Sequence, residues 1–458
     1  MSRSLPVPTP RVFMAGAAFA LLSLALLALY WWPAPKQFTG DEGSVYQHTA
    51  LAILGGGDWF DARMLWPPLQ PLFMAAIYAL AGTHLIAVQI VQLLLLAASG
   101  VLLHRIVRQL TGDDRHAFRA GLLLAVNPLT IGFATWLWPE ILHLFLSLAM
   151  AWLIIRARDA STPSRSIAFA AAAGAALGLC LLAKSLLTAF WPLLLLALLR
   201  RAEWRTSALR IIAFGLAALI VTAPALHRGW QLTGRAQIAD SSWFNLWAGL
   251  ADVRRGDYVE DMTGARMAAY LAGADSHAER VAFARRRALE TIQEQGIAGT
   301  AANQIGKQYF RLFDSRNSLV AQLPGPSCRG YLGHYRLEST VLARSIDYVA
   351  RSWHIALLVL FALGLAAWTQ WRRGWVWLTA AFVGYQLALF AGLHVKTRFL
   401  LPMMPVLCVF AGYFLSRLPE FTGRASPLSR GQRLAGMALA ALLAFLALAG
   451  PALDRACG

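Results

Sequence analysis

Residues 85–104 read LIAVQIVQLLLLAASGVLLH, a run without a single Asp, Glu, Lys or Arg. About 20 predominantly apolar residues are needed for a helix to cross the hydrocarbon core of a bilayer. Comparable apolar blocks recur along the chain at 12–32, 167–182 and 434–448. The sequence therefore predicts an all-α polytopic membrane protein.

The overall composition agrees with this prediction. The chain has 458 residues, of which 58% are hydrophobic and 14% are Asp, Glu, Lys or Arg. A soluble domain carries about 25% charged residues, so a water-soluble globular enzyme is excluded. The net charge is +18, but the basic residues are spread between the apolar blocks and form no single basic face. We therefore expect the lipid bilayer as a partner and no nucleic acid.

About eleven spanning helices are expected, and the basic residues orient them. Arg and Lys concentrate in the short segments that are cytoplasmic if the N-terminus lies inside the cell, for example at Arg105, Arg156 and Arg372. The positive-inside rule then places the two long loops outside. The expected spans are 12–32, 85–104, 120–135, 139–156, 167–183, 186–200, 211–226, 352–370, 375–393, 398–416 and 434–450.

The two long outer loops suggest a division into three parts. Loop 33–84, inside an N-terminal module 1–226, contains a weakly apolar stretch at 72–81. Counting that stretch as a span would invert every later loop, so we assign it to a helix lying at the outer surface. Residues 227–351 form a small α-rich extracytoplasmic domain with helical periodicity at 278–295 and 297–313, and 352–458 supply the last spans.

Three carboxylates near the outer face need an explanation, because charges at membrane depth are costly. Asp41 and Glu42 immediately precede an apolar-periodic helix, where a helix-capping role is an equal alternative to a functional one. Glu140 follows Trp138-Pro139 and starts an otherwise apolar span on the same outer side. It is the hardest of the three to dismiss as an interfacial acid.

Cations occur on the same side. Lys184 interrupts an apolar run with almost no loop around it, although a lysine that snorkels to the interface would look the same. His394, Lys396 and Arg398 form a second group, which a short solvated loop between two spans would also explain.

Carboxylates and cations on one membrane face suit transfer from an anionic leaving group. A carboxylate would take the proton of an acceptor hydroxyl, while Lys and Arg neutralise the phosphate charge that develops as the donor bond breaks. A divalent cation is optional, since Asp41, Glu42 and Glu140 offer oxygen ligands but the cations can stabilise a phosphate alone. No glycine-rich phosphate loop, zinc-protease motif or serine-nucleophile motif is present.

The order and common sidedness of these motifs resemble the GT-C superfamily of membrane glycosyltransferases. Within it, the chain is most similar to the branch of protein O-mannosyltransferases and bacterial lipid A aminoarabinose transferases. The resemblance covers roughly 39–415. The matching segments are Gly40-Asp41-Glu42 with Tyr46, Gly57-Asp58-Trp59, Pro67-Pro68-Leu69, Trp138-Pro139-Glu140, Gly178 to Lys184, Asn245-Leu246-Trp247-Ala248-Gly249, and Arg398-Phe399-Leu400-Leu401-Pro402 with Pro405.

The resemblance implies a GT-C fold, a polyprenyl-phosphate-linked sugar as donor, and a role for each matching residue. Asp41 becomes the candidate general base with Glu42 beside it, and Glu140 takes the place of a second acidic residue. Lys184 and Arg398 match the donor-phosphate side. By the same resemblance, Lys396 and His394 join that side, and Tyr46, Trp66 and Trp138 line the substrate cavity.

Two departures from the family pattern leave the donor sugar and the acceptor open. The aminoarabinose transferases carry a lysine where this chain has Pro67. The mannosyltransferases carry a His-Pro-Pro pattern, and here Trp66 replaces the histidine.

Together these inferences predict an inverting glycosyltransferase at the outer face of the bacterial cytoplasmic membrane. It would move a sugar from a polyprenyl-phosphate carrier to a hydroxyl or phosphate of a glycan, lipid or protein acceptor, with no cofactor required. The alternatives are a lipid-linked oligosaccharide ligase and a membrane transporter of lipid or glycan. Against a transporter, the carboxylates lie at one face and no pair of broken helices marks a midplane site.

Overall fold

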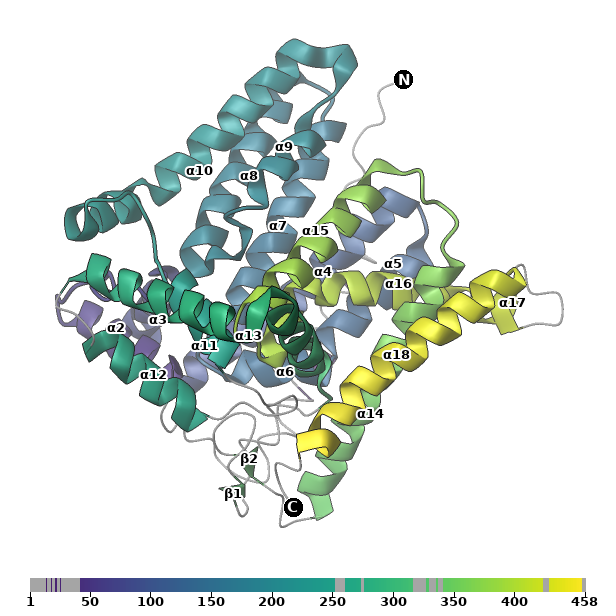
Figure 1. The fold of residues 1–458 in the computed structure, drawn as a ribbon. Coiled ribbons are helices and arrows are strands. Elements are labelled where there is room, and N and C mark those ends of the chain that lie inside the picture. Colours follow the sequence, from purple (N-terminus) through teal and green to yellow (C-terminus); the bar gives the residue numbers. More distant parts are fainter. Residues whose placement is uncertain are drawn as a thin grey trace.

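The computed structural model describes residues 42–251, 260–272, 276–315, 327–328, 335–336, 341–422 and 428–454, and isolated positions between 14 and 25. The expected first span, 12–32, lies outside the described residues except for those isolated positions, and so does Asp41. The described chain is almost entirely helical (Figure 1). Two short strands, β1 (Ser327–Cys328) and β2 (Tyr335–Arg336), pair antiparallel. The all-α prediction is confirmed.

Within the described residues, eight helical segments are long and apolar enough to cross a membrane. A ninth span results if the bent pair α5 (Asp114–Ala125) and α6 (Pro128–Thr135) is counted as one. The predicted count of eleven is therefore not reproduced. The eight are α4 (Leu85–Thr111), α7 (Glu140–Asp159), α8 (Pro163–Ala183), α10 (Trp204–Thr233), α14 (Val341–Ala367), α15 (Gly374–Gly392), η4 (Thr397–Met403) continued by α16 (Met404–Ser416), and α18 (Arg430–Asp454).

Two expected spans are interrupted. Segment 186–200 is not one helix but η1 (Ser185–Leu187) and the eight-residue α9 (Trp191–Leu198). Pro192, the second residue of α9, has no N–H to donate to the carbonyl oxygen of Thr188 four residues earlier, so helical hydrogen bonding does not run unbroken from η1 into α9. Segment 120–135 bends by 44° between α5 and α6, where Asn127 caps the second helix and Pro128 begins it. Two further short elements are η2 (Arg201–Glu203) and α17 (Leu418–Thr422).

Both long loops fold into helices, and the helices within each loop contact one another (Figure 1). The first loop contains α2 (Glu42–Leu54) and α3 (Leu69–Ala81), the helix expected at 72–81. The second contains α11 (Ser242–Ala251), α12 (Glu260–Ala272) and α13 (His277–Phe313). Leu65 and Trp66 of the first loop pack against Phe244 and Ala248 of α11, so the two loops share one apolar cluster.

Helix α13 is broken where the sequence predicts a boundary between two helices. Gly296 has φ 69° and ψ 157°, a conformation that glycine adopts without the steric cost that a Cβ would bring. Ser276 and Glu279 form a reciprocal capping box at the N-terminal end. The two halves, 277–295 and 297–313, therefore follow separate directions.

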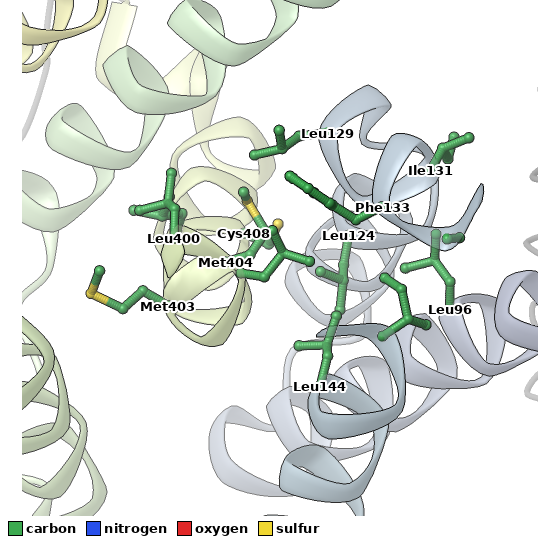
Figure 2. Close-up of a cluster of buried hydrophobic side chains, with 14 of the residues drawn as sticks. Leu96, Leu124, Leu129, Ile131, Phe133, Leu144, Leu400, Met403, Met404 and Cys408 are labelled. Atoms are coloured by element: carbon green, nitrogen blue, oxygen red, sulfur yellow. The ribbon is translucent and has the colours of Figure 1, made fainter. Parts of the chain in front are cut away.

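A buried cluster joins the C-terminal span to the N-terminal module (Figure 2). It brings η4, which carries Arg398, up to the start of α7, which carries Glu140. Its side chains are Leu400, Met403, Met404 and Cys408 from η4 and α16, and Leu124, Leu129, Phe133 and Leu144 from α5, α6 and α7. Transfer of such a side chain from water into a protein core contributes about 1.5–3 kcal/mol. Between membrane spans the surrounding lipid is also apolar, so close van der Waals packing supplies the attraction.

Helices α8 and α10 approach each other through small residues. A Cβ added to Gly174 would collide with the backbone carbonyl oxygen of Phe214 on α10, and one added to Gly178 would lie 2.8 Å from Cβ of Val221. Small residues at such contacts let the backbones of two spans pack closely.

We expect Gly174→Val to destabilise the protein by about 1–3 kcal/mol, because the overpacked contact must move backbone rather than a flexible side chain. The measurement is the thermal unfolding midpoint of the detergent-solubilised protein. Gly215→Val is the matched control, since a Cβ at Gly215 on α10 meets nothing within 4 Å. Equal losses in the two variants would contradict the close approach as the cause.

Candidate active site

The loop before α7 is held in place by three buried glutamines. Gln92 of α4 donates through Nε2 to the carbonyl oxygens of Ala134 (2.9 Å) and Trp136 (2.6 Å). Gln70 donates to Leu137 O (3.0 Å), and Gln89 to Thr135 O (2.7 Å). Since unpaired backbone carbonyls are costly away from water, these bonds let a non-helical turn exist inside the bundle. The turn ends at Pro139, and α7 begins at Glu140.

Three charged residues predicted from the sequence meet at this point. Oε1 of Glu140 lies 2.9 Å from Nζ of Lys184 and 3.6 Å from Nε of Arg398. The Glu140 side chain is 2% exposed, and Lys184 is 16% exposed. Lys184 thus points into the protein to its carboxylate partner, and not along the bundle surface as a snorkelling lysine would. Three segments, the start of α7, the end of α8 and η4, supply one charge each.

Aromatic rings cover the two cations. Cζ of Arg398 lies 4.3 Å from the ring centroid of Trp138, which stacks on Trp136 at 4.4 Å. Nζ of Lys184 lies 4.7 Å from the ring centroid of Phe399. A cation over an aromatic face in a desolvated site gains about 2 kcal/mol. Each cation is therefore held between a carboxylate and a ring, in a defined position.

The second half of α13 adds cations that the sequence reasoning missed. Lys307 and Arg311 are fully buried, with Gln304 and Gln308 beside them on the same helix face. Gln304 donates to Gly392 O (3.4 Å), which ties this face to the segment just before His394. Their spacing of i, i+3, i+4 and i+7 marks one polar helix face in the sequence, and that face points into the protein, whereas Ile297 and Ile305 are exposed.

His394 shows how much positive charge gathers here. Burial lowers the pKa of His394 well below 6.5, and Lys396, Arg311, Arg398 and Lys307 lower it further by repelling a proton. His394 is therefore neutral near pH 7. Lys396 and Arg398 are also buried, so the group 394–398 is not a solvated loop.

The remaining predicted residues are placed as follows. Tyr46 on α2 is buried, and its ring makes an edge contact with Trp66 at 6.1 Å between centroids. Both belong to or pack against the apolar cluster that contains Trp138. Glu42 is the first residue of α2, and Asp41 lies outside the described residues. The described part of the chain contains no group of three His, Cys, Asp or Glu side chains arranged to hold a metal ion.

The Asn245–Gly249 motif supports the segment that carries the cations. The backbone N–H of His394 donates to Asn245 O at 3.1 Å. A Cβ at Gly249 would lie 2.7 Å from the same nitrogen, so only glycine lets α11 approach this closely. The motif thus positions the turn between α15 and η4.

Comparisons with known proteins show what the chain is similar to. Residues 66–227, about a third of the chain, match the family model of dolichyl-phosphate-mannose-protein mannosyltransferases. No curated protein matches the chain. The apo oligosaccharyltransferase of Archaeoglobus fulgidus is similar in structure, with TM-score 0.51 and 14% identity, over 97% of this chain and 55% of that chain. Apo ArnT from Cupriavidus metallidurans matches with TM-score 0.41 and 14% identity, over 96% of this chain and 79% of that one.

The predicted resemblance to the GT-C superfamily is thus confirmed, and the mannosyltransferase model covers the part that carries Trp138, Glu140 and Lys184. The chain spans about half the length of the archaeal oligosaccharyltransferase. At 14% identity the structural likeness establishes the fold alone.

We expect Glu140→Gln to destabilise the protein by about 3–5 kcal/mol, because it leaves Lys184 and Arg398 buried together without their shared counter-charge. Adding Lys184→Met to Glu140→Gln should recover part of that loss, which a double-mutant cycle on unfolding midpoints measures. Glu420→Gln, which breaks the exposed pair with Arg417 at 3.6 Å, is the control and should change stability by less than about 1 kcal/mol. Additive effects of the two buried changes would argue against coupling.

Proposed function

We propose that the protein is an inverting glycosyltransferase that moves a sugar from a polyprenyl-phosphate carrier to a hydroxyl or phosphate acceptor. The observation that carries the proposal is the junction between the buried charges and an apolar cavity. That cavity has a volume of about 210 Å³ and lies among α4, α7, α9, α15 and α16. Leu144, Leu187 and Pro402 line it, and they follow Glu140, Lys184 and Arg398 by about one helical turn each. The cations therefore lie about one helical turn beyond one end of an apolar cavity.

A lipid phosphate would fit this junction, because it has both an anionic phosphate and an apolar chain. Its phosphate is attracted by Lys184 and Arg398, and the nearby Lys307, Arg311 and Lys396 add to the positive field. Its apolar chain would enter the cavity from the bilayer, which places the cleaved bond at the membrane face. The family model over 66–227 supports a donor of this class, since its description names dolichyl phosphate mannose.

The chemistry of transfer then needs one displacement. The base removes the proton of the acceptor hydroxyl, the acceptor oxygen forms a bond to the anomeric carbon, and the bond from that carbon to the phosphate oxygen breaks. The electron pair stays on the polyprenyl phosphate, whose added charge is neutralised by Lys184 and Arg398. Asp41 is the proposed base, with Glu42 beside it. Glu140 already forms ion pairs with Lys184 and Arg398, so we assign it the role of positioning these two cations.

The positions of the three charged residues along their helices also help to distinguish a transferase from a transporter. Glu140 opens α7, Lys184 follows the last residue of α8, and Arg398 lies in η4 at the start of its span. Buried charges at the ends of helices suit a reaction at one membrane face better than a midplane transport site. A lipid-linked oligosaccharide ligase would use the same chemistry on a larger donor. We place the reaction at the outer face of the bacterial cytoplasmic membrane, as the distribution of basic residues indicates.

The proposed base is tested by Asp41→Asn. We expect this change to keep expression and folding but to lower transfer of sugar from a polyprenyl-phosphate donor by about 100-fold or more, the contribution typical of a general base. The assay uses purified protein in detergent, where transport has no meaning. Glu42→Gln is the neighbouring comparison, and near-normal turnover in Asp41→Asn would remove Asp41 from the mechanism.

The two phosphate cations are tested by charge-preserving exchange. Arg398→Lys should raise the KM for the donor at least about tenfold, because an ammonium lacks both the bidentate fork and the planar stacking on Trp138. Lys184→Arg should be milder if the larger group fits under Phe399. Initial rates against donor concentration decide, with Arg398→Ala and Lys184→Ala as references. Unchanged donor kinetics in both alanine variants would refute the phosphate assignment.

A further inference from the structure

A second cavity lies in the extracytoplasmic domain, away from the buried charges. It has a volume of about 620 Å³, within the range of about 300–1,000 Å³ typical of small-molecule sites. The first half of α13, the start of α11 and the segment after α10 line it. We call it the outer hollow and define it by Arg235, Asp240, Trp243, Arg285, Arg286 and Glu290.

The outer hollow carries an excess of positive charge. In the described part of the chain, Arg235, Arg285 and Arg286 make no ion pair within 4.0 Å, whereas Arg287, which does not line the hollow, pairs with Glu290 at 3.2 Å. The other carboxylate of the wall, Asp240, lies 3.4 Å from His277. The guanidinium groups are therefore available to an anionic ligand.

The rest of the lining suits a saccharide. Trp243 offers an aromatic face, with Cζ of Arg285 at 5.6 Å from its ring centroid. Thr233, Gln293 and the two carboxylates can exchange hydrogen bonds with sugar hydroxyls. A lipid headgroup would use only the arginines, whereas an acidic saccharide would use the arginines, the aromatic face and these hydrogen-bonding groups together, so we favour the saccharide.

The outer hollow is physically connected to the candidate active site through α11. Trp243 stands near the N-terminal end of this helix, and Gly249, six residues later, packs on Leu393 and His394. Six residues of helix span about 9 Å. Met64, which accepts a hydrogen bond from the backbone N–H of Asp240 at 2.7 Å, links the same wall to the first outer loop. A glycan longer than one sugar could thus lie in the hollow and reach the reaction centre.

We propose that the outer hollow binds the acceptor, and that the acceptor is an acidic saccharide whose carboxylate or phosphate contacts Arg285 and Arg286 while a sugar ring lies on Trp243. This inference rests on the proposed function, because only a transferase needs an acceptor site. It assigns the specificity for the acceptor to residues of the extracytoplasmic domain and not to the membrane helices.

The test is equilibrium binding to the purified full-length protein in detergent, measured by saturation-transfer NMR without donor. The probes are trigalacturonate, glucose 6-phosphate and neutral maltotriose, which separate carboxylate, phosphate and uncharged sugars. We expect at least one acidic probe to bind more tightly than maltotriose. The double variant Arg285→Gln, Arg286→Gln and the variant Trp243→Ala should each weaken that binding about tenfold or more.

Arg205→Gln is the control, because Arg205 is an exposed arginine at the start of α10 that does not line the hollow. It should change binding less than about twofold, a difference of about 0.4 kcal/mol. Equal binding of maltotriose, an equal loss in Arg205→Gln, or arginine-dependent binding only to nanodiscs of anionic lipid would each overturn the proposal. Because no turnover is needed, a failure here is distinct from a failure of donor transfer, which would overturn the proposed function instead.

Discussion

The buried carboxylate of Glu140 is the constraint on which this structure depends. It lies between Lys184 and Arg398, which come from spans far apart in the sequence. Removing three charges from water costs several kcal/mol per ion unless their geometry satisfies them. The start of α7, the end of α8 and η4 must therefore meet within a few ångströms, and the apolar cluster of Figure 2 packs α7 against η4 and α16, the segments that carry Glu140 and Arg398.

Polar groups around this centre have two separate tasks. Gln70, Gln89 and Gln92 donate to backbone carbonyls and so hold the turn before α7 in a non-helical conformation. The cations instead gather around His394 and Glu140, where Lys307, Arg311, Lys396 and Arg398 all act on the His394 ring. Their summed positive field would attract an anion, which suits the donor phosphate that we propose.

The sequence revealed the charges that interrupt apolar runs, because an isolated charge in such a run is conspicuous. Glu140, Lys184 and Arg398 were found in this way, and the structure brings them together. Lys307 and Arg311 were missed, since they lie in a polar loop domain where a cation needs no explanation, and only the fold shows that their helix face is buried. The span predicted at 186–200 failed for a related reason: hydropathy alone does not register the break at Pro192.

The break at Gly296 has a consequence for how this fold can diversify. In an unbroken helix, one inserted residue turns everything after it by about 100°, which would swing Lys307 and Arg311 out of place. Because Gly296 is not helical, the directions in which the side chains of 297–313 point are not fixed by the helical turns of 277–295. Insertions and substitutions in the first half can then accumulate without disturbing the second. The first half, which lines the outer hollow, can therefore change while Lys307 and Arg311 in the second half keep their positions.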